Sequence, residues 1–127
     1  MPIEHEFDAR RRLLCVRMLG VVTDDDVLDY AEAITADESR GPEYDELIDL
    51  RKLETPAAST DTLRRVADIF RKYERQPELV KVAFIAASDA AYGIARMYQA
   101  FRAESSADMR VFREADEARR WLGLEPE

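Results

Sequence analysis

The hydrophobic positions of the chain follow two alternating patterns. Short, largely continuous apolar runs predict five strands, at residues 3–8, 13–22, 44–50, 79–87 and 109–112. Between them, apolar residues three and four positions apart predict four helices, which begin near residues 23, 59, 88 and 114. The predicted order of elements is therefore β-β-α-β-α-β-α-β-α.

The connections between these elements predict the sheet. The turn at residues 8–11 is too short for a crossover, so the first two strands should pair antiparallel, with 3–8 at an edge. Helices separate the later strands, and repeated β-α units form parallel sheets through right-handed crossovers. We expect an α/β fold: a mixed, mostly parallel five-stranded sheet covered by about four helices, in one domain over residues 1–127.

The helical stripes also predict details of packing. In the helix at 88–104, Tyr92 and Met97 lie off the stripe that should face the sheet. Gly93 beside them weakens the helix, so it marks either the close approach of another molecule or close packing on the sheet. In the last helix, Trp121 belongs to the only apolar stripe and should be largely buried.

Composition and charge exclude several classes of protein. Acidic residues outnumber basic ones by 27 to 19, for a net charge of −8, and such a chain repels the phosphates of nucleic acids. The longest apolar stretch, 82–87, is far shorter than the roughly 20 residues of a membrane span. One cysteine forms no internal disulfide, and no signal peptide is visible, so we expect a cytoplasmic protein with no integral membrane segment.

Few residues suit catalysis. His5 is the only histidine and has no nucleophile beside it, and Cys15 is expected to pack as a small apolar residue. Three consecutive carboxylates at 24–26 cannot all face one metal ion, and the positive start of a helix explains them. No glycine-rich phosphate loop occurs among the four glycines. We therefore expect no enzyme, no cofactor and no metal.

One set of polar residues remains as a candidate site. The crevice beyond the carboxyl ends of parallel strands is the usual binding site in such sheets, and helix N-termini there offer N–H groups to an anion. The candidate residues for a ligand or interaction crevice are Thr23, Asp24, Asp49, Arg51, Ser88, Asp89, Tyr92 and Arg96, with Arg113 at the fourth strand exit. The alternative is that these residues are helix caps and surface ion pairs.

Four segments resemble the STAS superfamily, and most closely its SpoIIAA-like branch, also called STAS/SEC14-like. The similar segments are Gly-x-x-Thr at 20–23, Asp-Leu-Arg at 49–51, the strand and helix at 82–98, and the phenylalanine strand with an Ala-x-x-Trp-Leu helix at 111–122. The resemblance implies a bacterial-type, non-enzymatic regulatory or protein-interaction domain, whose partner is another protein or a second copy in a homodimer. The alternative is a binder of a small anionic or lipid-like ligand, in the strand-end crevice or between helices.

The chain departs from the phosphorylatable members of that superfamily. Those proteins carry an Asp-Ser-Ser-Gly-like motif in the loop that follows a strand, and the corresponding segment here, 49–61, lacks it. Ser59 and Thr60 lie near the right place and are candidate phosphoacceptors, since an added phosphate would change a partner interface. The alternative is that one of them caps the next helix.

Overall fold

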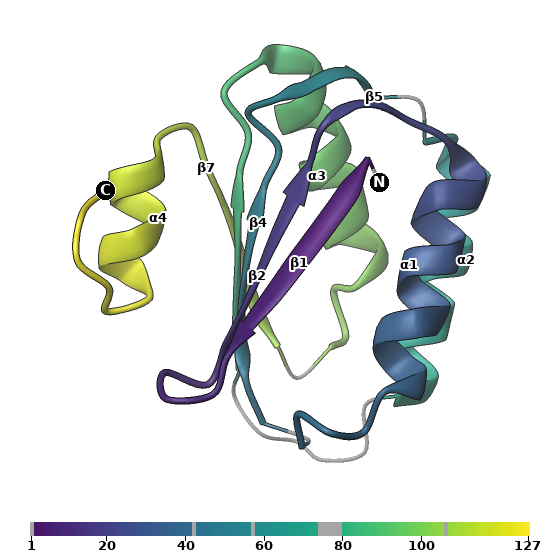
Figure 1. Cartoon of the computed structure of the whole chain (residues 1–127). Helices are drawn as coiled ribbons and strands as arrows, with labels where there is room; N and C mark the ends of the chain where they lie inside the picture. The colour runs from purple at the N-terminus through teal and green to yellow at the C-terminus, as the bar shows by residue number, and fades with distance from the viewer. Residues whose placement is uncertain (1, 42, 57, 74–79, 106) are drawn as a thin grey trace.

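The computed structural model describes residues 2–41, 43–56, 58–73, 80–105 and 107–127 (Figure 1). In chain order, the elements are β1 (Ile3–Asp8), β2 (Leu13–Met18), β3 (Gly20–Val22), α1 (Asp24–Ala36), β4 (Asp45–Asp49), β5 (Leu53–Pro56), α2 (Thr60–Tyr73), β6 (Lys81–Ile85), α3 (Asp89–Phe101), β7 (Asp108–Phe112) and α4 (Ala115–Trp121). From its sequence, Gln76-Pro77 is expected to break the helix that begins near residue 59, but these residues lie outside the described ones, as does Leu79 at the start of the predicted strand 79–87.

The main sheet confirms the predicted fold class. Its strand order is β1-β2-β4-β6-β7, with β1 antiparallel to β2 at one edge and the other neighbours parallel. The turn before β2 is closed by Asp8, whose carboxylate accepts hydrogen bonds from the backbone N–H groups of Arg10 (3.0 Å) and Arg11 (3.1 Å). This local closure explains why the first pair is antiparallel, while each later parallel step contains a helix.

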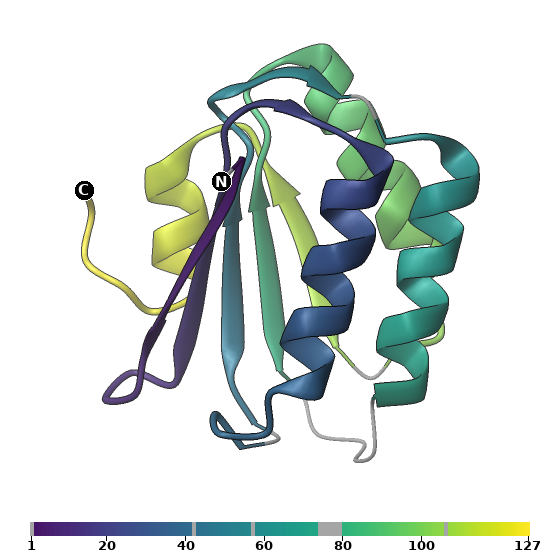
Figure 2. The ribbon, with the colours of Figure 1, turned by 45° about the vertical axis from the view of Figure 1, so that its right-hand side comes forward.

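Helices cover both faces of this sheet. Helices α1, α2 and α3 lie on one face and α4 lies on the other (Figures 1 and 2). Successive side chains of a strand point to opposite faces. Thus Leu14 and Ile48 belong to the larger core beneath α1–α3, whereas their neighbours Leu13 and Leu47 belong to the smaller core beneath α4. Of the helices that the structure describes, none is both long and apolar enough to cross a membrane.

The smaller core corrects one prediction. Ala115 and Ala118 of α4 are buried, but Trp121 is only half-buried, so the expectation of a largely buried indole is wrong. The ring packs against Phe112 on one side, with a distance of 5.7 Å between ring centroids. Lys81 Nζ lies 5.2 Å from its centroid and also donates a hydrogen bond to the Trp121 carbonyl. The short helix contacts β6 and β7 of the sheet, and its last turn stays partly open to water.

A second, two-stranded sheet was not predicted. The apolar run 13–22 is not one strand, because Leu19 interrupts it and Gly20, the first residue of β3, has a φ of +66°. β3 pairs in parallel with β5, which lies between the predicted strand 44–50 and the helix that begins near residue 59, where no strand was predicted. The Gly20 N–H donates to the carbonyl of Lys52 at 2.9 Å. This small sheet lies beyond the carboxyl ends of the main strands (Figure 1).

Candidate functional site

The predicted crevice residues form three groups at the strand ends, the first of which follows β4. Arg51 donates to both carboxylate oxygens of Asp49, at 3.0 Å and 2.7 Å, and also forms an ion pair of 2.7 Å with Glu127. Burial raises the pKa of Asp49, but hydrogen bonds from Arg51 outweigh this effect, so the pKa lies below its ordinary value. The guanidinium is thus engaged by two carboxylates rather than open to an anion.

The second group lies at the start of α3. Ser88 caps this helix, since its hydroxyl oxygen accepts a hydrogen bond of 3.1 Å from a backbone N–H of the first turn. Arg113, just after β7, forms an ion pair of 2.9 Å with Asp89, and its guanidinium lies 4.2 Å from the centroid of the Tyr92 ring. Arg96 is exposed further along the helix. Because Asp89 is almost fully exposed, this ion pair contributes little to stability.

The third group joins the starts of α1 and α2. Thr23 and Asp26 form a capping box, in which each side chain accepts a hydrogen bond from the other residue's backbone N–H. Asp24 accepts a hydrogen bond of 2.8 Å from the backbone N–H of Ser59. The Ser59 hydroxyl in turn accepts one of 3.1 Å from the N–H of Thr62, so the prediction that Ser59 caps α2 is confirmed. Two of the three consecutive carboxylates therefore hold helix starts in place.

Among the described residues, the hydrogen bonds and ion pairs of the predicted crevice residues stay within these three groups. Their use as caps and ion pairs matches the structural alternative, and a crevice shared by all three groups stays a prediction. A phosphate on Ser59 or Thr60 also stays a prediction. At Ser59 it would meet the Asp24 carboxylate, which accepts from the Ser59 N–H.

The outer face of α3 carries apolar surface. Met97 is 38% exposed, which confirms its predicted place off the core stripe, and its sulfur accepts a hydrogen bond of 3.6 Å from the Thr60 hydroxyl. Tyr92 is half-buried against the larger core, so the same prediction is wrong for Tyr92. The guanidinium of Arg113 lies over its ring. A Cβ at Gly93 would meet no atom within 4 Å, so close packing on the sheet does not explain this glycine.

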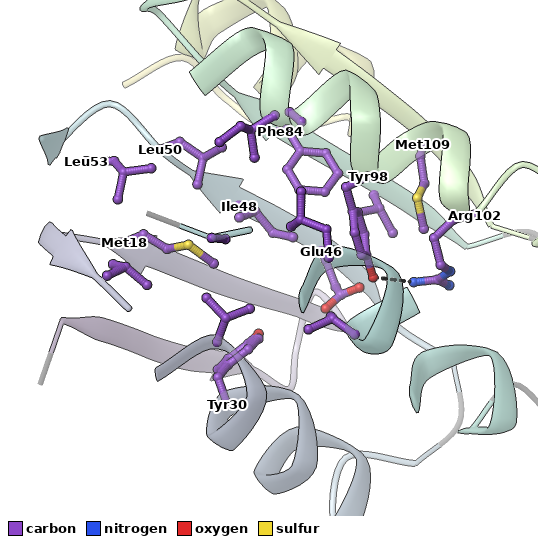
Figure 3. Close-up of a pocket in the computed structure, with 18 of the residues that line it drawn as sticks. Met18, Tyr30, Glu46, Ile48, Leu50, Leu53, Phe84, Tyr98, Arg102 and Met109 are labelled. Carbon is purple, nitrogen blue, oxygen red and sulfur yellow. Dashed lines mark hydrogen bonds between the residues drawn. The ribbon is translucent and has the colours of Figure 1, made fainter. Parts of the chain in front are cut away.

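A largely apolar cavity of about 100 Å³ lies between the sheet and the helices α1–α3. We call it the inner pocket (Figure 3). Strands β4 and β6 supply Ile48 and Phe84, and α1, α2 and α3 supply Val27, Val66 and Ala95. The pocket therefore lies inside the larger core rather than in the crevice that the sequence predicted.

Polar groups lie at one end of the inner pocket. Glu46, Tyr98 and Arg102 line it together (Figure 3). Arg102 is 9% exposed and donates hydrogen bonds to the Tyr98 hydroxyl (2.9 Å) and to Ser105 (3.1 Å). Its guanidinium also lies over the Phe70 ring, 5.5 Å from the centroid. Tyr98, Ser105 and Phe70 thus hold the Arg102 guanidinium at the edge of the apolar pocket.

The hydroxyl of Tyr30 belongs to the wall of this pocket. It is buried, and it has no hydrogen-bond partner among the residues that the structure describes. Leaving a buried hydroxyl unsatisfied costs about 1–3 kcal/mol. Burial, and then the nearby charge of Glu46, raise the pKa of Tyr30 well above its ordinary value, so the hydroxyl stays neutral. It can donate a hydrogen bond to a bound molecule or accept one.

Sequence reasoning missed this pocket, although two signals pointed to it. Glu46 alternates with Ile48 and Leu50, so the period of a strand places a carboxylate on the inward face. Tyr98 and Arg102 are four residues apart, a spacing at which two side chains on a helix meet. The volume of the space left between the side chains has no signature in the sequence.

Comparisons with known proteins identify the relatives of this chain. The sequence model of the SpoIIAA-like family matches residues 13–123. A similar solved structure is an uncharacterised protein of the DUF3478 family with a SpoIIAA-like fold from Shewanella loihica PV-4. It is 18% identical, with a TM-score of 0.63 over 94% of this chain and 93% of that chain. No curated protein matches this chain. At this identity, the structural likeness establishes the fold alone.

Proposed function

We propose that this chain, which belongs to the SpoIIAA-like family, is a non-enzymatic domain that binds a small apolar molecule in the inner pocket. Proteins of this family generally have no catalytic activity. The observation that carries the proposal is an apolar cavity inside the larger core with an unpartnered buried hydroxyl on its wall. A small free cavity in a well-packed core costs stability, and a ligand that fills it recovers the lost contacts.

The size and the walls of the pocket support a compact ligand. Apolar cavities of about 150 Å³ stay dry and take up benzene, and the inner pocket is of the same order. The strand-end residues offer less to a ligand, because Arg51 and Arg113 are already paired with carboxylates. A molecule with one ring or a short chain therefore fits the inner pocket better than an anion fits the predicted crevice.

Titration with toluene tests this proposal. We expect toluene to shift the methyl NMR signals of Val27, Val66 and Ile48, all of which line the pocket. In Val66→Phe, the new ring occupies the cavity and these shifts should disappear. The matched control is Val111→Phe, since Val111 is partly buried against the same core but does not line the pocket. Wild type without saturable shifts, or a Val66→Phe variant that binds as wild type does, would contradict the proposal.

The second candidate function is contact with a protein partner, for which we propose a second copy of the chain. Val21 and Met97 are the large hydrophobic residues that the structure shows exposed, at 56% and 38%. Val21 lies on β3, which pairs with β5, and α3, the helix of Met97, contacts β5. SpoIIAA-like domains generally interact with proteins. The partly buried free thiol of Cys15 fits a reducing compartment, the cytoplasm in this proposal.

Sedimentation velocity tests this second candidate. We expect wild type to form dimers at micromolar concentration and the double variant Val21→Ser/Met97→Ser to stay monomeric. Arg120→Ser is the control, because Arg120 is exposed on α4, on the opposite face of the sheet (Figure 2). Equal masses of wild type and the double variant would show that this surface does not join two copies.

A further inference from the structure

The wall of the inner pocket carries a hydroxyl group to which no residue that the structure describes is hydrogen-bonded. The Tyr30 side chain extends from α1, its ring meets the edge of the His5 ring at 5.9 Å between centroids, and its hydroxyl reaches the pocket (Figure 3). Its oxygen is buried and unpartnered among the described residues. Buried polar atoms are nearly always hydrogen-bonded in folded proteins, so such an orphan in a cavity wall indicates a missing partner.

The charges around the pocket limit what that partner can be. Glu46 and Arg102 place one negative and one positive charge in the wall, so the wall offers a charged ligand no net attraction. The Arg102 guanidinium donates to the neutral hydroxyls of Tyr98 and Ser105 and keeps its positive charge. A ligand that carries a charge would also lose its hydration on entering an apolar cavity. The pocket therefore favours a neutral molecule.

Resting on the proposed function, we infer that the inner pocket selects a neutral one-ring molecule with a single hydroxyl group, which exchanges a hydrogen bond with the hydroxyl of Tyr30. The aromatic walls formed by Phe84 and Tyr98 suit a ring, since their own rings lie edge to face with centroids 6.0 Å apart. A hydrocarbon of the same shape fills the space but leaves the Tyr30 hydroxyl unsatisfied. A carboxylate of the same shape loses its hydration in the apolar cavity.

Three probes that share one tolyl group test this inference: p-cresol, toluene and p-toluate. Their dissociation constants are measured by NMR titration in wild type, Tyr30→Phe and Glu46→Gln. From wild type to Tyr30→Phe, the affinity for p-cresol should fall by about 2- to 10-fold, the range of one net hydrogen bond, while toluene binding stays the same. Glu46→Gln should improve the binding of p-toluate. Tyr92→Phe is the matched control, because Tyr92 does not line the pocket, and it should change none of the three affinities.

The outcomes separate this inference from the proposed function. If toluene binds wild type and Tyr30→Phe leaves the ratio of p-cresol to toluene affinity unchanged, the role of Tyr30 is overturned and the proposed function stands. If p-toluate binds wild type as tightly as p-cresol, the preference for a neutral ligand is overturned. If none of the three probes binds to folded wild type, the proposed function itself fails. Thermal melting of each variant confirms that it is folded before its affinities are compared.

Discussion

Replacing Gly93 by alanine should stabilise the protein. Gly93 lies inside α3, and glycine in a helix interior is less favourable than alanine by about 0.8–1.0 kcal/mol. The added methyl group would meet no atom within 4 Å, so no clash opposes the gain in helix propensity. We therefore expect the free energy of unfolding to rise by about 0.5–1 kcal/mol. The melting temperature should rise by roughly 3 °C in a domain of this size.

Gly20→Ala provides a matched control with the opposite expected sign. A methyl group at Gly20 would also meet no atom within 4 Å, but its φ of +66° lies in the left-handed region. An alanine there costs about 1–2 kcal/mol, because its Cβ approaches the following carbonyl oxygen. The two variants make the same chemical change in equally open space. Any difference between them must come from the backbone conformation.

Urea and thermal unfolding of the two variants decide the matter. The reasoning predicts that Gly93→Ala melts above wild type and Gly20→Ala below it, with the same urea dependence in all three proteins. A Gly93→Ala protein that is less stable than wild type would refute the prediction and show that the residue faces something within the folded monomer. If stability rises as expected while self-association weakens, the bare backbone at Gly93 belongs to the contact between copies.

Three further predictions concern the packing and the strand-end groups. Trp121→Ala should destabilise the protein by about 2 kcal/mol, below the usual 3–5 kcal/mol for a fully buried aromatic residue, as measured by urea unfolding, because the indole is only half-buried. Arg51 lowers the pKa of Asp49, so the Asp49 carboxylate contributes its full stabilisation above about pH 4. This contribution is lost as the pH falls through the folded-state pKa. Asp49→Asn should therefore flatten the acid side of the profile of stability against pH. Ser59→Ala should lower stability by about 1 kcal/mol through loss of the cap on Thr62, whereas Ser59→Asn should retain most of it.

The directions of the main strands could be predicted because each depends on local features. The turn after Asp8 is short and the later strands are separated by helices, so chain length alone distinguishes antiparallel from parallel pairing. The small β3–β5 sheet could not be predicted in the same way. Its strands have three and four residues, and β5 carries a charged and polar sequence with proline at its end. Pairing over so few residues depends on the rest of the fold placing the two segments together.

The candidate site could be predicted only in part, for a different reason. The sequence predicted Ser88 as one helix cap and either Ser59 or Thr60 as another, because capping is a local interaction between residues two or three positions apart, and the structure has Ser88 and Ser59 in these roles. The inner pocket depends on how side chains from three helices and the sheet fill one volume. The space that these side chains leave unfilled cannot be read from the order of residues. The alternation of strand residues places the charge of Glu46 on the inward face. The sequence does not show which side chains lie opposite it in the core.

The two proposed functions share helix α3, and this has a thermodynamic consequence. Ala95 and Tyr98 line the inner pocket from one face of α3, while Gly93 and Met97 are exposed on the other. If ligand binding shifts this helix, p-cresol changes the dimerisation constant, and dimerisation changes the affinity for p-cresol. Linkage requires that the two factors, counted per bound ligand, are equal. Sedimentation with and without saturating p-cresol gives the first factor, and titration of dilute and concentrated protein gives the second. Equal factors different from one would show that ligand binding and dimerisation are coupled. Unequal factors cannot describe the same two equilibria, so they would show that one of the two signals comes from another site.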